Sequence, residues 1–136
     1  MKRGLIILLV VIITLSAGCT IERENPKDIT ADMISIYYGA SSYAFFTSEE
    51  GMDSAIVEEL VDSYKRLSLE PSDKKIDIAT MYHIVFMNQG EMVASISVDE
   101  NGVFWLNGKT DTYRQNGGDF HYSRIAEIYN NSKVKN

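Results

Sequence analysis

The amino-acid sequence predicts an α+β fold: an antiparallel sheet of about five to six strands, in the order ββ-α-ββββ-α, with two helices packed on one face. Three observations favour this class. Short segments with strand-like alternation are joined by turns of hairpin length, two segments carry apolar residues at helical spacing, and one strand is apolar mainly on one side. An antiparallel sheet with one covered face and one open face accounts for all three.

The folded part begins with a predicted hairpin. Residues 33–38 alternate in side-chain character as a β-strand does, residues 39–42 (GASS) have the composition of a turn, and residues 43–47 are aromatic and β-prone. We therefore expect two paired strands at the start of the domain.

Two helices are predicted from apolar residues at helical spacing. The first follows Asp53 as N-cap, carries Lys65 and Arg66 in its last turn, and is closed by Pro71; the second follows Asp119 as its cap. The residues expected to face the sheet are Ile56, Val57, Leu60, Val61, Tyr64, Leu67, Phe120, Ile125, Ile128 and Tyr129.

Further strands are predicted at residues 81–86, 91–98, 103–106 and 110–114, separated by turn sequences such as DENG at residues 99–102. In residues 92–98, Met92 and Ile96 share one face, whereas Val93, Ser95 and Ser97 share the other, which should be wet. The helix-covered face is expected to hold Ile34, Ile36, Ile84, Phe86, Met92, Ile96 and Leu106.

The N-terminal residues have the order of a secretory signal peptide. Lys2 and Arg3 precede an apolar run at residues 5–15, and small residues follow at 16–18. As a helix, this run would span roughly 16 Å against a hydrocarbon core of about 30 Å, so a membrane-spanning helix is a poor interpretation.

The segment LSAGC, residues 15–19, resembles the lipobox of bacterial lipoproteins, and Cys19 is the one cysteine of the chain. In that family the cysteine receives a diacylglycerol group and the preceding peptide is removed. The resemblance implies a protein anchored to the lipid bilayer through acylated Cys19, at the cell membrane and facing outside the cytoplasm. The alternative is a chance cysteine behind an uncleaved anchor.

The predicted organisation has four parts: a cleaved signal peptide at residues 1–18, the lipidated cysteine and a polar tether at 19–30, one α+β domain at 31–130, and a polar tail at 131–136. In the order of its elements, the domain resembles small uncharacterised domains of lipoproteins from Gram-positive bacteria. That resemblance implies no active site.

The charge of the chain argues against nucleic-acid binding. The sequence has 13 Lys and Arg against 19 Asp and Glu, a net charge of −6, and removal of residues 1–18 would make it −8. Nucleic acid and anionic lipid both repel such a domain. A domain without cysteine also has neither a disulfide nor a cysteine-ligated metal.

The candidate motifs for cofactor or metal binding do not have the residue spacing that such sites require. NGKT at residues 107–110 lacks the upstream glycine of a phosphate-binding loop, because Val103 stands at that position. Asp99, within DENG, is explained by turn chemistry, since the spaced ligands of a calcium loop are missing. His83 and His121 have no partner at zinc-ligand spacing. We expect no cofactor, no metal and no catalytic residue.

Aromatic residues are the strongest functional signal, because half of those in the first hairpin must face away from any single core. We expect a non-catalytic binding module for an envelope protein, a peptide or a cell-wall glycan. A Ser–His contact between the strands of His83 and Ser97 is conceivable, so the alternative is a small envelope hydrolase using His83 or His121. The candidate binding face comprises Tyr37, Tyr43, Phe45, His83, Ser95, Ser97 and Trp105.

Overall fold

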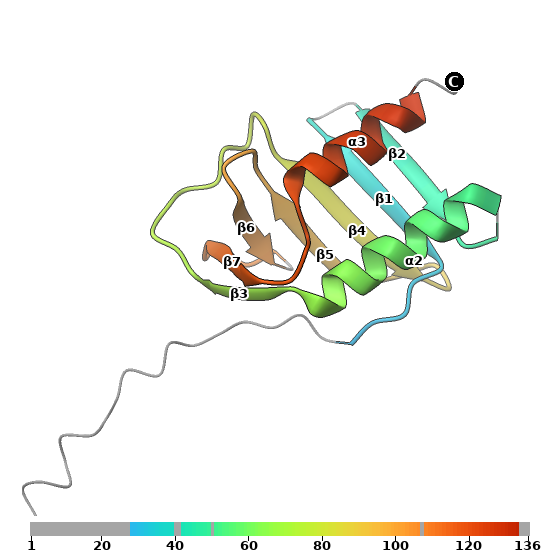
Figure 1. Cartoon of the computed structure of the whole chain (residues 1–136), viewed down its shortest axis with the longest axis horizontal. Coiled ribbons are helices and arrows are strands. Elements are labelled where there is room, and N and C mark those ends of the chain that lie inside the picture. Colours follow the sequence, from blue (N-terminus) through green and yellow to red (C-terminus); the bar gives the residue numbers. More distant parts are fainter. Residues whose placement is uncertain (1–27, 40–41, 50, 107, 134–136) are drawn as a thin grey trace, which may run out of the picture.

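The structure is a computed structural model that describes residues 28–39, 42–49, 51–106 and 108–133 (Figure 1). The predicted signal peptide, Cys19 and most of the predicted tether lie outside the described residues, as does the end of the predicted tail.

The described chain forms one antiparallel sheet and two helices. The sheet has seven strands in the spatial order β2-β1-β4-β5-β6-β7-β3. In chain order the elements are β1 (Met33–Tyr38), β2 (Ser42–Thr47), α2 (Gly51–Arg66), β3 (Ser68–Pro71), β4 (Tyr82–Asn88), β5 (Glu91–Val98), β6 (Val103–Leu106), β7 (Tyr113–Gly117) and α3 (Tyr122–Lys133).

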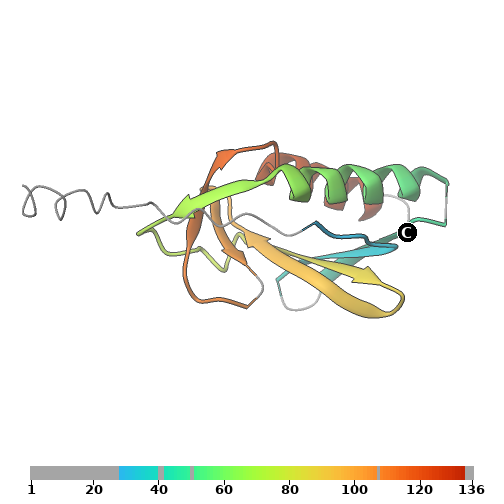
Figure 2. The same cartoon turned by 90° about the horizontal axis from the view of Figure 1, so that it is seen from below.

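Both helices lie on the same side of the sheet, as Figure 2 shows. The α+β class and the antiparallel sheet are therefore confirmed, but the expected count of about five to six strands is wrong. The added strand is β3, which pairs with β7 across a bulge between Ser68 and Leu69. It has four residues, too few for alternation to reveal it, and Pro71 is tolerated because β3 is an edge strand.

The core lies between the helices and the sheet. Ile34, Ile36 and Ile84 are fully buried on the sheet side. From the helices, Tyr64 packs its ring 4.8 Å from that of Phe86, and Tyr129 lies 5.3 Å from Tyr82. Burial raises the pKa of Tyr82 to about 12. All ten residues predicted to face the sheet are buried or partly buried in this core, although Leu67 follows α2 and Phe120 precedes α3.

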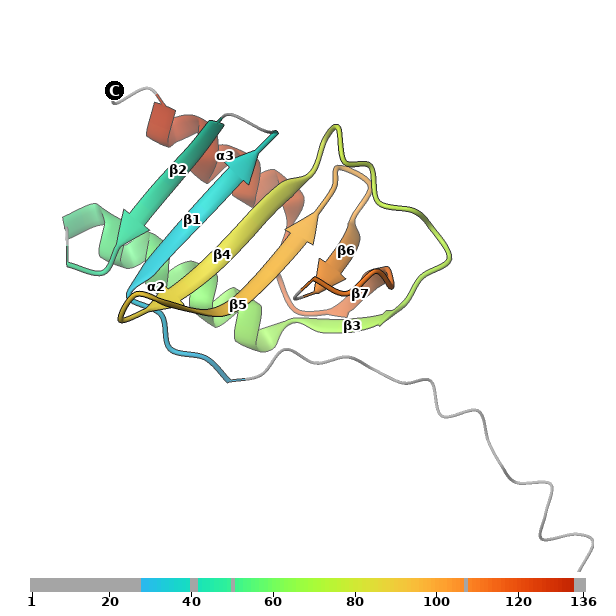
Figure 3. The same cartoon turned by 180° about the vertical axis from the view of Figure 1, so that it is seen from behind.

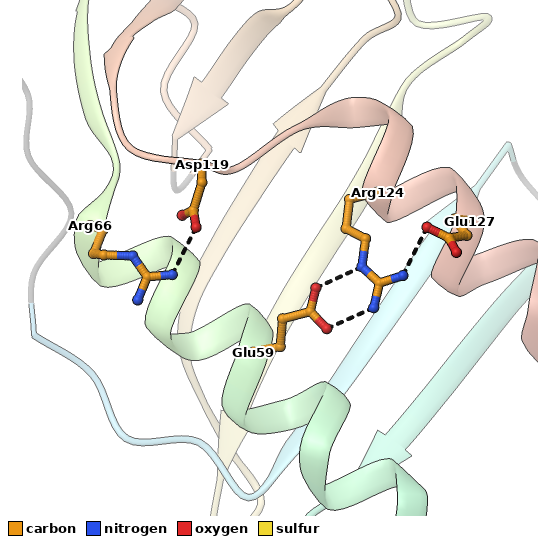
Figure 4. Close-up of polar contacts among 5 residues, drawn as sticks. All are labelled: Glu59, Arg66, Asp119, Arg124 and Glu127. Atoms are coloured by element: carbon orange, nitrogen blue, oxygen red, sulfur yellow. Dashed lines mark hydrogen bonds and ion pairs between the residues drawn. The ribbon is translucent and has the colours of Figure 1, made fainter.

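Ion pairs connect α2 with α3 and with the segment before α3 (Figure 4). Arg124 of α3 binds Glu59 of α2 with two hydrogen bonds, of 2.7 and 2.8 Å, and also reaches Glu127 at 2.8 Å. Arg66, at the end of α2, donates a hydrogen bond of 2.9 Å to Asp119. These contacts lower the pKa values of Glu59 and Asp119 and link the two helices.

Both predicted helix caps are wrong. Helix α2 begins at Gly51, so Asp53 lies within its first turn, where its charge still complements the helix dipole. Helix α3 begins at Tyr122, and the carbonyl of His121 accepts hydrogen bonds from the amides of Arg124 and Ile125. Asp119 precedes this helix and its carboxylate is bound to Arg66 instead.

Met92 was expected on the helix-covered face and lies on the other one. The register of β4 and β5 shifts between Phe86 and Met87, so Ala94 pairs with Phe86 whereas Met92 pairs with Met87. A one-residue bulge reverses which face the following side chains take. Met92 is accordingly 63 % exposed.

Candidate open-face binding site

The face of the sheet opposite the helices is the candidate site. In Figure 3, strands β2, β1, β4 and β5 lie in front of both helices, so neither helix covers this face. Side chains alternate along each strand and directly paired residues share a face. Because Ile34, Ile36, Ile84 and Ile96 are buried toward the helices, the residues between them point to this open face.

The strand register assembles one row of side chains across five strands. Tyr43 of β2 pairs with Tyr37 of β1, and Tyr37 pairs with His83 of β4. His83 pairs with Ser97 of β5, and Ser97 pairs with Trp105 of β6. The ring of Tyr37 lies 5.9 Å from that of Tyr43 and 6.2 Å from that of His83, so the aromatic end of the row is continuous.

A second row runs beside the first. Phe45 pairs with Ser35, Ser35 with Val85, and Val85 with Ser95. The rings of Phe45 and Tyr43 are 6.5 Å apart. The two rows bring together all seven residues of the candidate binding face that the sequence suggested; their role in binding stays a prediction.

The two ends of this face differ in exposure. At the β2 end Tyr43 is 62 % exposed and Phe45 58 %. At the other end Ser95 and Ser97 are buried, although the sequence predicted a wet surface there. Both serines line a pocket together with Trp105 and residues 108–110, so they lie in a recess and not on a flat surface.

That pocket has a volume of about 300 Å³ and is lined by Met81, His83, Ser95, Ile96, Ser97, Trp105, Gly108, Lys109 and Thr110. The indole N–H of Trp105 is buried and has no hydrogen-bond partner among the described residues. The pocket offers an apolar wall with hydroxyl and imidazole groups, a composition common in sites for small ligands or for a protruding side chain.

His83 and Ser97 form the contact that the sequence suggested. The Nδ1 atom of His83 lies 2.8 Å from Oγ of Ser97, at hydrogen-bond distance. Burial lowers the pKa of His83, so the ring favours its neutral form. Among the described residues, no carboxylate is hydrogen-bonded to this imidazole. The pair thus lacks the acid that orients the histidine in a catalytic triad.

Sequence reasoning missed the methionines of this face. Met33, Met87 and Met92 follow one another across β1, β4 and β5, next to Thr47 of β2. Strand alternation in residues 33–38 was enough to place Met33 on this face, but Met92 lies in this row only because of the β4–β5 bulge. Methionine side chains adapt to irregular apolar surfaces, which suits a contact area.

The other candidate histidine lies elsewhere. His121 is exposed just before α3 and lines a groove of about 880 Å³ with Lys74, Asn101, Arg114 and Tyr122, among others. The structure therefore does not bring His121 and His83 into one site.

The carboxylate of DENG is structural. Asp99 is fully buried and accepts hydrogen bonds from the backbone amides of Asp77, Asn101 and Val103, at 2.8 to 2.9 Å. It joins the β5–β6 turn to the loop before β4. Across the described residues, no three histidine or acidic side chains gather as metal ligands would.

Comparisons with known proteins add no relative: this chain matches no protein-family model, no curated protein and no solved structure. None of the helices in the described residues is long and apolar enough to span a membrane.

Proposed function

We propose that this protein binds a partner protein through the open face of its sheet, while an acylated Cys19 anchors it to the membrane outside the cytoplasm. One observation carries the binding part: an exposed, uncharged aromatic cluster of Tyr37, Tyr43 and Phe45 lies on a face that neither helix covers. Exposed apolar clusters of this kind are typical of interaction sites.

The composition of the face favours protein over glycan. Aromatic and methionine side chains are enriched in protein interfaces and charged side chains are depleted from interface cores. The two rows and the methionines contain no Asp, Glu, Lys or Arg. A partner with apolar side chains fits this surface, and the pocket beside Trp105 could take one of them.

In-cell cross-linking tests the binding surface. A photo-reactive amino acid at Tyr43 is expected to capture a protein, and Tyr37→Ala in the same chain to reduce that product by about tenfold or more, since contact centres carry most of the affinity. The matched control is the same photo-reactive group at Ile78, which is 67 % exposed but lies in the loop before β4. Equal capture at both positions, or capture of cell-wall glycan instead, contradicts the proposal.

The anchor rests on the order of residues 1–19 and is tested separately. Metabolic labelling with a fatty acid should mark the wild-type chain, and Cys19→Ser should abolish the label and release the protein from the membrane fraction. An intact N-terminal peptide in the mature protein, seen by mass spectrometry, refutes the anchor without touching the binding face.

A hydrolase is the second candidate, and the His83–Ser97 contact is the observation that favours it. Against it, Ser97 is 4 % exposed and stands within a strand, whereas a nucleophile is usually presented at a turn beside oxyanion donors. A fluorophosphonate probe is expected to leave the protein unlabelled. Labelling that disappears in Ser97→Ala would establish the hydrolase instead.

A further inference from the structure

The two edges of the sheet are built differently. At one end, β3 has four residues, a bulge, Pro71 and the ion pair of Glu70 with Arg114. Such features prevent an edge strand from pairing with another chain. At the other end, β2 has six residues in regular register with β1, and its sequence SYAFFT contains neither charge nor proline.

Strand β2 therefore has an edge open to pairing. It ends the strand order, and its backbone groups that point away from β1 have no sheet partner among the described residues. Figure 3 shows β2 as the outermost strand, with its outer side clear of other strands. An exposed edge rich in β-prone aromatic residues is a template for a further strand.

We propose that β2 pairs with β2 of a second copy of this chain, forming a symmetric dimer with one continuous sheet. A twofold axis normal to the sheet makes the two strands antiparallel and places one residue opposite its own copy. With Ala44 on the axis, Tyr43 of each copy faces Phe45 of the other. The open face then gains two cross-strand aromatic pairs, and the small Ala44 side chains meet on the helix side.

The charges beside β2 do not oppose a second copy in this arrangement. Glu49 follows β2 at its C-terminal end, and residues 39–41 (GAS), between β1 and β2, include no charged residue. Antiparallel pairing sets Glu49 of each copy beside the other's turn. The two Glu49 residues are then about 33 Å apart at ~3.3 Å per residue, well beyond the Debye length of roughly 8 Å.

Disulfide cross-linking of the full chain tests the register. Under mild oxidation, Ala44→Cys should form a covalent dimer in high yield, because it faces its own copy within bridging distance. Met92→Cys is the matched control: it is exposed on the open face but belongs to a central strand. The wild-type chain, whose one cysteine is Cys19, reports any link made through that residue.

A second measurement needs no cysteine. The full chain should show a reversible dimer over about two decades of concentration, either by sedimentation or by cross-linking with a reagent that does not react with lysine. Phe45→Lys should raise the dissociation constant of this dimer by about tenfold or more. Met92→Lys should leave the constant unchanged. A monomer at every concentration, or equal dimer yield from Ala44→Cys and Met92→Cys, overturns the proposal. Capture of a second copy at Tyr43 supports the dimer, whereas capture of a different protein there bears only on the proposed function.

Discussion

The two faces of the sheet come from the same strands and differ in chemistry. Toward the helices, Ile34, Ile36, Ile84 and Phe86 are fully buried and pack with the aromatic residues of α2 and α3. On the open face, Tyr43 and Phe45 are more than half exposed. Strand alternation thus separates two sets of side chains: one stabilises the fold, and the other forms the surface for which we propose partner binding.

The largest loss of stability is expected from a substitution on the face that the helices cover. Phe86→Ala should lower the free energy of unfolding by about 3 to 5 kcal/mol, because it leaves a cavity against Tyr64. Phe45→Ala, on the open face, should cost no more than about 1 kcal/mol. Chemical denaturation of both variants measures the difference. Equal losses would mean that the open face is as closely packed as the covered one.

The next largest loss of stability is expected at Asp99, a buried polar residue directly after β5. Asp99→Ala leaves three backbone amides without their acceptor and should cost about 2 kcal/mol or more. Asp111→Ala removes an exposed carboxylate and serves as control. A near-neutral Asp99→Ala variant would show that water replaces the carboxylate there.

A smaller effect tests the outer side of the helix layer. Glu59→Gln weakens the bidentate contact with Arg124 and should cost about 0.5 to 1 kcal/mol, since both side chains are partly exposed to solvent. The matched control is Glu58→Gln, the exposed neighbour on α2. Thermal unfolding of the two variants gives the comparison.

The pH dependence of this pair has a definite sign. Arg124 holds the pKa of Glu59 below its ordinary value, so the contact contributes its full stability above an unfolded pKa of about 4.3. That contribution is lost as the pH falls through the lower folded pKa. Glu59→Gln should therefore lose less stability than wild type between about pH 5 and pH 3. An unchanged acid profile contradicts this assignment.

The sequence predicted what depends on local alternation. Once residues 33–38 and 82–88 are strands, the placement of Tyr37 and His83 on one face follows from period two alone. The helix stripe containing Leu60 and Tyr64 follows in the same way from helical spacing. For this reason the residues that share the open face could be listed before the geometry was known, whereas their role in binding stays a prediction.

What the sequence could not predict depends on contacts between distant segments. The β4–β5 bulge that turns Met92 outward has no marker in MVASISV, and β3 is a strand only because β7 lies beside it. Asp119 is of a residue type common at helix N-caps, but Arg66, 53 residues earlier, binds its carboxylate. The pocket that Ser95 and Ser97 line likewise includes residues 108–110, which follow β6 in the chain.

The smallest expected effect lies on the open face itself, at its buried polar pair. Burial lowers the pKa of His83, so below the unfolded pKa of about 6.5 the unfolded chain takes up more protons than the folded one. Stability should therefore fall as the pH drops from that value toward the folded pKa of His83. Denaturation midpoints at about pH 7 and about pH 5 should show this fall in wild type and a smaller one in His83→Gln.

His121→Gln is the control for this titration, because His121 is exposed and lies away from the face. If it removes the pH dependence and His83→Gln does not, the buried pair is not its source. If His83→Gln removes it, the open face has two parts: exposed rings near β2 that are free to bind, and a neutral His83–Ser97 pair that contributes to folding. Binding variants should then be made at Tyr37 and Tyr43, where stability stays nearly constant.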